Sequence, residues 1–261
     1  MSNVEIIWEL TSERVASVLK EGKRLDNRAF DEYRKIEITN GISKNADGSA
    51  RVKLGETEVI CGIKSDIGEP YPDSPGEGSI SVGMELLPIA SPSFESGPPS
   101  EESIEISRVV DRGIRESKAL DFKKLCIREG EKVWIVFIDL YAINDDGNLF
   151  DASSIAALSA LLDARTPKIE DDKIVKGEYA GKFKLERKPL LSTFAKIGNS
   201  IVLDPNLAEE KALQGRFSVA TTEDDYLSAF QKGYGGGFSV TEIDNCLSIA
   251  LKKSKEIRKL L

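Results

Sequence analysis

Residues 131–164 read EKVWIVFIDLYAINDDGNLFDASSIAALSALLDA and contain the elements that decide the fold. Residues 131–143 form a long apolar run typical of a buried strand, and residues 151–166 form a helical pattern whose apolar surface is nearly continuous. The loop 144–153 between them (NDDGNLFDAS) places acids and a glycine where a phosphate or a metal often binds. The sequence therefore predicts a buried strand, a buried helix, and a candidate site in the loop that joins them.

Helix and strand patterns extend this core toward the N-terminus. An amphipathic helix that packs on the body is expected from the helical spacing of Ile6, Ile7, Leu10, Val15, Val18 and Leu19. Residues 49–55 and 57–64 predict a hairpin with a Gly-Glu turn, because β-branched residues alternate on both sides of that turn. Further expected elements are strands at 33–39 and 78–90, an exposed loop at 91–103 rich in Pro, Ser, Gly and Glu, and a helix at 101–120.

The chain is expected to divide into two lobes of class α+β, since each shows several strands followed by helices. The predicted boundaries are an N-terminal helix and arm (1–30), a first lobe (31–167), a polar connecting segment (168–189) and a second lobe (190–261). The second lobe is predicted to hold strands near 191–196, 200–203, 217–222 and 226–231 and a helix from about 240 to 260.

Composition restricts the chemistry. The 36 Lys and Arg against 44 Asp and Glu give a net charge of -8, which argues against binding nucleic acid through bulk electrostatics. Contact with a polyanion would need a local basic patch or a partner. The chain has no histidine, so Ser-His-Asp and Cys-His nucleophile systems, HExxH sites and imidazole zinc sites are excluded. We expect no metal and no cofactor.

Cysteine use and hydropathy predict a soluble cytoplasmic protein. Cys61, Cys126 and Cys246 are odd in number and lie far apart in apolar surroundings, which favours reduced core residues over a reactive thiol. The N-terminus lacks the layout of a signal peptide, and no apolar run approaches the ~18 residues that span a bilayer.

The helix EISRVVDRGIRES carries Arg108, Arg112 and Arg115 on one face, opposite its apolar residues. One interpretation is a clamp for a phosphate backbone, because guanidinium groups match phosphate oxygens. The other is a solvated face neutralised by pairs from Glu105 to Arg108 and from Asp111 to Arg115. Spacing alone favours the solvated face.

Two further motifs favour structural readings. Residues 232–240 (KGYGGGFSV) are rich in glycine but lack a complete nucleotide-binding pattern, and Ser239 with Glu242 predicts a capped helix after a flexible turn. The acids Asp139, Asp145, Asp146 and Asp151, with Asp204, Glu209 and Glu210 from the second lobe, are the only obvious catalytic inventory. Turn and surface-loop chemistry is the favoured explanation of these acids, and the sequence does not show whether the two groups meet.

Four stretches, in order, resemble the ribonuclease PH family over nearly the whole chain: KRLDNR (23–28), GSARVKLGETEVICGIK (48–64), EISRVVDRGIRES (105–117) and IDLYAINDDGNLFDASSIAALSALLDA (138–164). The resemblance implies the two-lobed ribonuclease PH-type fold, similar to domain 2 of ribosomal protein S5, preceded by an N-terminal helix. Within the family the chain is similar to the non-catalytic type found in the archaeal exosome.

Departures from the family's catalytic pattern point to that type. Catalytic members carry D-G-[GS]-[TS]-R after the buried strand, whereas here Asp146-Gly147 is followed by Asn148, Leu149 and Phe150. Leu and Phe cannot compensate a phosphate dianion, so these positions form a degenerate phosphate site. In the second lobe, Arg216 aligns with the family's catalytic acid. Two separate parts of the catalytic site are thus replaced.

The resemblance implies a subunit that is inactive alone and serves a complex that degrades RNA by 3′ to 5′ phosphorolysis. The implied partners are a catalytic ribonuclease PH-type subunit, in a hetero-hexameric ring of three heterodimers, together with S1-domain cap proteins and single-stranded RNA. It also favours RNA contact by Arg112 and a neighbour, with Arg115 the most structural of the three arginines. The alternative is an autonomous phosphate-dependent 3′ to 5′ exoribonuclease that uses Asp145, Asp146 and Asp204.

Overall fold

The computed structural model describes residues 3–261, with side chains from residue 8 onward. Its helices are α1 (Asn3–Lys20), α2 (Glu101–Glu116), the 3-10 helix η1 (Phe122–Leu125), α3 (Leu149–Asp163), α4 (Leu207–Ala212) and α5 (Val240–Arg258). Its strands are β1 (Ile36–Asn40), β2 (Gly48–Leu54), β3 (Thr57–Gly68), β4 (Ser79–Leu86), β5 (Cys126–Arg128), β6 (Lys132–Asn144), β7 (Arg165–Glu170), β8 (Lys173–Lys182), β9 (Leu190–Ile197), β10 (Ser200–Leu203), β11 (Gly215–Thr221) and β12 (Leu227–Gly233).

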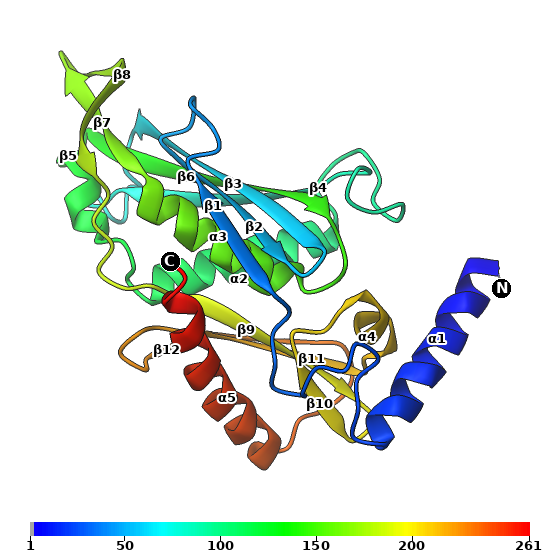
Figure 1. Cartoon of the computed structure of the whole chain (residues 1–261). Coiled ribbons are helices and arrows are strands. Elements are labelled where there is room, and N and C mark those ends of the chain that lie inside the picture. The colour runs from blue at the N-terminus through cyan, green and yellow to red at the C-terminus, as the bar shows by residue number, and fades with distance from the viewer. Residues whose placement is uncertain (1–2) are drawn as a thin grey trace.

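Two sheets enclose a pair of helices. The larger sheet has the order β1-β2-β3-β6-β4, with β5 paired to β6, and the smaller has the order β10-β9-β11-β12. Within the larger sheet β4 runs parallel to β6, whereas β1, β2 and β3 join by antiparallel pairing. Helices α2 and α3 lie between the sheets, and α5 covers the far face of the smaller sheet (Figure 1). This arrangement is the α+β fold that the sequence predicts.

Helix α3 is the centre of the core, which explains its apolar sequence. All residues from Leu149 to Leu161 are buried, because the larger sheet packs on one side and β9 on the other. The start of β2 crosses this helix closely. A Cβ atom at Gly48 would lie 2.4 Å from the Cα of Ala164 and 2.5 Å from the carbonyl oxygen of Ala160, so only glycine fits there.

The predicted hairpin between β2 and β3 is confirmed, with Leu54 opposite Thr57 across a two-residue turn. The polar segment after residue 167 differs from the expectation of a simple link, because β7 and β8 pair there as a hairpin. Asp171 and Asp172 both adopt positive φ at its tip, the geometry of a tight hairpin turn. Helix α4 was not predicted, because its six residues are too short to show a hydrophobic period.

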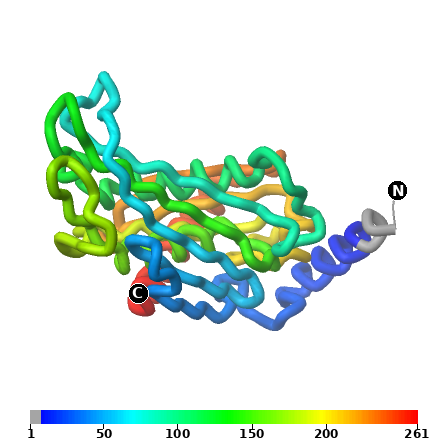
Figure 2. Tube along the Cα trace, turned by 90° about the horizontal axis from the view of Figure 1, so that it is seen from above, coloured from blue at the N-terminus to red at the C-terminus, as the bar shows by residue number. Residues whose placement is uncertain are grey.

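Helix α1 packs on the body through its C-terminal half. Val15 and Leu19 are buried against Ala195, Ile197 and Val202 of the smaller sheet, and Figure 2 shows the helix leaving the body at one edge. Leu10 was expected on the packed face, but its side chain is 62% exposed. The side chains of Ile6 and Ile7, also expected there, lie outside the described residues. No helix between residues 3 and 261 is long and apolar enough to span a membrane.

A buried ion network ties the N-terminal arm to both sheets. Asp204, fully buried after β10, accepts hydrogen bonds from Arg28 Nη1 at 2.9 Å, Arg34 Nη2 at 2.8 Å and Asn148 Nδ2 at 2.7 Å. Arg24, 2% exposed, forms a two-pronged ion pair with Glu209 at 2.8 and 2.6 Å. Asp204 and Glu209 were interpreted as part of an ordinary surface loop, and that reading is wrong because both carboxylates are buried and paired.

Replacing Asp204 with asparagine should lower the free energy of unfolding by about 3–5 kcal/mol, because two buried guanidinium groups lose their anion. Urea denaturation measures this value. Asp172→Asn is the matched control, since Asp172 also has positive φ and two cationic partners, Arg128 and Lys132, but is exposed. That change should cost less than about 1 kcal/mol. Equal losses for the two variants would contradict the central role of Asp204.

Candidate functional site

The three predicted arginines of α2 come together in one groove. Arg108, Arg112 and Arg115 line a depression of about 360 Å³ between α2 and residues 80–82 of β4, together with Asp111 and Glu116. Ile106, Val109, Val110 and Ile114 are buried on the opposite face of the helix, as the spacing predicts. The groove combines guanidinium groups on a rigid element with open access, which is what binding of a phosphate backbone requires.

The side-chain partners of α2 differ in part from the expected pairs. Arg115 pairs with Asp111 at 2.8 Å, as expected, and lies over the ring of Phe122. Glu105, however, pairs with Arg216 of β11 rather than with Arg108. Arg108 is exposed and makes no ion pair or hydrogen bond with any described residue. Of the three arginines, Arg108 is therefore the most available to a ligand, whereas Arg115 makes the most contacts with other residues of the chain.

The turn before α3 packs directly against the turn before α4. Gly147 has a φ of 83°, and a Cβ atom there would lie 2.6 Å from the backbone nitrogen of Leu207. Asn148 follows in the left-handed region and is fully buried. Its side-chain amide donates to Asp204 at 2.7 Å and to Asp151 at 3.0 Å. The acids of the two predicted groups therefore do meet, with Asn148 as the bridge between them.

The backbone amide of Asn148 is already occupied by a carboxylate of the same chain. Its N–H donates to Glu210 Oε1 at 2.8 Å, and the N–H of Gly147 donates to Asp145 Oδ1 at 3.0 Å. Amides at the start of a helix are a common anion site. Here two internal carboxylates take the place of an external anion.

Leu149 and Phe150 form the first turn of α3 and are 3% and 2% exposed. The guanidinium of Arg216 lies over the ring of Phe150, 4.1 Å from its centre. The two parts of the sequence that depart from the family's catalytic pattern are thus in contact. A cation–π pair of this kind stabilises the buried arginine without any phosphate.

Carboxylates dominate the electrostatics around this contact. Burial raises the pKa of Glu210 to about 8, the Asn148 amide lowers it, and the nearby Asp145 raises it further. Burial also raises the pKa of Asp145 and that of Glu102. Burial therefore favours the neutral, protonated form of each of these carboxyl groups.

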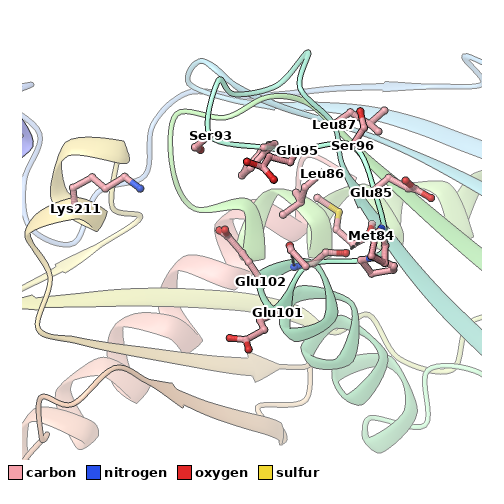
Figure 3. Close-up of a pocket in the computed structure, with 16 residues that line it drawn as sticks. Met84, Glu85, Leu86, Leu87, Ser93, Glu95, Ser96, Glu101, Glu102 and Lys211 are labelled. Carbon is pink, nitrogen blue, oxygen red and sulfur yellow. Dashed lines mark hydrogen bonds between the residues drawn. The ribbon is translucent and has the colours of Figure 1, made fainter. Parts of the chain in front are cut away.

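A pocket of about 640 Å³ lies beside this centre (Figure 3). Residues 84–87 of the β4 region, residues 93–103 and Lys211 line it. Lys211 extends from α4 toward the space on the side opposite the 93–100 loop, and Glu102 faces the same space from the start of α2. The loop was expected to be exposed, and its residues from 95 to 100 are mostly so.

The remaining sequence candidates lie elsewhere or are structural. Asp139 projects from the outer face of the larger sheet, between Gly62 and Gly83 on the neighbouring strands, and does not reach the acid cluster. Among residues 8–261, whose side chains the structure describes, no group of three or more acidic or cysteine side chains is arranged to hold a metal ion. The predicted capping box of Ser239 and Glu242 is present at α5. Cys61 and Cys246 are buried, but Cys126 is only partly so.

Sequence reasoning missed two residues of the site. Glu105 appeared only as a partner for Arg108, and Gln231 did not appear at all, although it donates to Glu105 Oε1 at 2.9 Å. Gln231 lies on β12, far from α2 in the sequence, so no local pattern could have linked it to the arginines.

Comparison with known proteins gives consistent matches. Residues 32–167 match domain 1 of the 3′ exoribonuclease family, and residues 189–253 match domain 2. The chain is 48% identical to the exosome complex component Rrp42 of Thermococcus gammatolerans, over all of this chain and 97% of that protein. It is 47% identical to the Rrp42 component of Methanothermobacter thermautotrophicus, over 98% of this chain and 96% of the relative.

Solved structures show the same fold. A chain from the Archaeoglobus fulgidus exosome with RNA bound to the active site superposes with a TM-score of 0.92, at 43% identity, over 97% of this chain and 98% of that chain. A chain from an archaeal exosome core gives a TM-score of 0.89 at 39% identity, over 99% of each chain.

Replacing Glu210 with glutamine should flatten the dependence of stability on pH. The folded pKa of about 8 lies above the ordinary value of 4.5, so the stability that this group contributes at low pH is lost as pH rises from about 4.5 to 8. One group changes the free energy of unfolding by at most about 1.4 kcal/mol per pH unit. Urea denaturation at several pH values between 5 and 8 should give a smaller slope for Glu210→Gln than for the unchanged chain.

Glu37→Gln provides the control for this measurement. Lys35 lowers the pKa of Glu37, so that carboxyl titrates below the pH window and its loss should leave the slope unchanged. Identical slopes for Glu210→Gln and the unchanged chain would show that the pKa of Glu210 is not raised in the folded protein.

Proposed function

This chain belongs to the 3′ exoribonuclease family, also called the ribonuclease PH family, and we propose that it is the non-catalytic ribonuclease PH-type subunit of an archaeal exosome. In that role it supports the active site of a catalytic partner and contributes to RNA binding. The proposal draws on full-length similarity to Rrp42 components and to chains of archaeal exosome structures.

The main support for a lack of activity is that side chains of this chain occupy the centre of the site, around Asn148 and Phe150. Glu210 accepts the Asn148 amide, and Arg216 lies against Phe150, so the chain's own groups satisfy the positions an attacking phosphate would need. Phosphoryl transfer depends on positive groups that stabilise the transferring phosphorus. Three carboxyl groups with raised pKa values surround this centre instead.

RNA binding would use the α2 groove. Arg108 is free of intramolecular partners among the described residues, and Arg112 donates only through Nη1. Their remaining donors can reach the phosphates of a single strand, which explains how a chain with net charge -8 binds RNA locally. Arg115 supports the groove through its pair with Asp111.

The assembly follows from the same premise. The partner would be a catalytic ribonuclease PH-type subunit, arranged with this chain as three heterodimers in a six-membered ring, and S1-domain proteins would cap one face. The cytoplasm is the expected location. In such a ring, a local basic groove beside the RNA path would suffice, and the surface as a whole need not be basic.

An autonomous exoribonuclease is the alternative, and the acid set argues against it. Asp204 is committed to two arginines and Asn148, and Asp146 lies 3.3 Å from Arg34. Asp145 accepts the Gly147 amide. These contacts leave few free carboxylate oxygens to position a metal or a water molecule.

The purified chain, given oligoadenylate, phosphate and magnesium, should release no ADP, because its centre cannot hold the attacking phosphate. Chromatography of the products measures release. Mixed with its catalytic partner, the same preparation should form a complex far larger than 28.6 kDa and release ADP. Release that persists through stringent repurification of the isolated chain, and is lost in Asp146→Ala, would establish the autonomous enzyme instead.

Changing Arg108 and Arg112 together to alanine should weaken binding of single-stranded RNA by the assembled complex. Each phosphate contact contributes about 0.7 to the slope of log affinity against log salt, so the slope should fall by about 1.4. Fluorescence anisotropy across a salt series measures it. The matched control changes Lys173 and Lys176, two exposed cations of β8, and should leave the slope unaltered. If the arginine variant kept the full slope, the chain would be a scaffold without RNA contact.

A further inference from the structure

We propose that Arg216 is a positioning residue for RNA binding, because it fixes Glu105 and, through Gln231, holds Arg112 at the groove. This inference rests on the proposed RNA contact of α2 and deepens it. The residue that stands where catalytic relatives carry an acid would then have a role of its own, outside chemistry.

A continuous set of contacts joins the two arginines. Arg216 Nη2 donates to Glu105 Oε1 at 2.5 Å, and Gln231 Nε2 donates to the same oxygen at 2.9 Å. Gln231 Oε1 accepts from Arg112 Nη1 at 3.3 Å, and the same amino group donates to the Phe230 carbonyl at 3.0 Å. Arg112 is therefore held at one end by β12, while its Nε and Nη2 make no hydrogen bond with any described residue.

Arg216 itself has little freedom to move. Its side chain, on β11, crosses the neighbouring strand at Gly233, where a Cβ atom would lie 2.8 Å from Nη2. The ring of Phe150 lies on its guanidinium at 4.1 Å, and the residue is only 6% exposed. Its Nε is buried without a hydrogen-bond partner in the described part of the chain. Glu105 is consequently its main fixed polar contact.

This geometry explains why position 216 requires an arginine. A carboxylate there would face Glu105 at close range, and the repulsion would release Glu105 from its place between β11 and β12. Lysine could pair with Glu105 but could not offer a planar group to Phe150. Glu105 has one oxygen shared by two donors, so losing Arg216 also loosens Gln231 and the strand-side anchor of Arg112.

The test is a double-mutant cycle in the complex assembled with the catalytic partner, read by anisotropy with single-stranded oligoadenylate at fixed salt. Arg112→Ala and Arg216→Met should each weaken RNA binding, the latter by about 3- to 10-fold, the loss of one ordered charge-assisted contact. The double variant should bind no more weakly than Arg112→Ala, because Arg216 acts through Arg112.

Arg258→Met is the matched control. Arg258 is also a partly buried arginine with several hydrogen bonds, to Lys188, Thr221 and Ser254. It lies on α5, outside the relay, by which we mean the set of contacts that joins Arg216 to Arg112 through Glu105 and Gln231. Any effect it has through general stability should add to that of Arg112→Ala. Thermal unfolding of each complex separates loss of folding from loss of positioning.

The outcomes are distinguishable. If Arg112→Ala leaves RNA binding unchanged, the proposed RNA contact fails. If Arg112→Ala weakens binding but Arg216→Met does not, or if the two effects add, the relay is wrong and the RNA contact stands. If the Arg216→Met variant does not assemble, Gln231→Met replaces it in the double-mutant cycle with Arg112→Ala. This change removes the amide link to Arg112 and leaves the buried Arg216 in place.

Discussion

The structure depends on one buried carboxylate, that of Asp204. It lies at the turn after β10, has no exposed surface, and accepts hydrogen bonds from Arg28, Arg34 and Asn148. These three residues belong to the N-terminal arm and to the turn before α3, so a single side chain sets the position of the arm, the larger sheet's helix and the smaller sheet. Burying such charges is costly unless every oxygen is paired, and the cost of leaving one unpaired is what makes the arrangement specific.

The same network determines why the site has its present form. Asn148 uses its side chain to bridge Asp151 and Asp204, and its backbone, in the left-handed region, donates its N–H to Glu210. Gly147 must precede it, because the turn before α4 leaves no room for a Cβ atom. The backbone donors of this turn are therefore used inside the protein.

Sequence reasoning found what local patterns encode. The buried strand β6, the largely buried helix α3, the hairpin of β2 and β3 and the capped helix α5 each have a hydrophobic period or a turn signal of their own. It missed α4, which is shorter than two turns, and the β7–β8 hairpin, whose strands are charged on their exposed faces. In the site it identified Phe150 and Arg216 as unusual through the family pattern. Their contact, and the pairing of Glu105 with Arg216 in place of Arg108, depend on strand register and helix docking that no local spacing contains.

The net charge of -8 is compatible with an arginine groove because the acids and the exposed arginines lie in different parts of the molecule. Around Asn148 the acids are internal, and burial raises the pKa values of Glu210 and Asp145. On α2, Glu105 pairs with Arg216 of β11 rather than with an arginine of the groove. Arg108 has no ion-pair partner among the described residues. At physiological salt, charges beyond about 8 Å are largely screened. A strand of RNA at the groove would therefore respond to the nearby guanidinium groups more than to the acidic total.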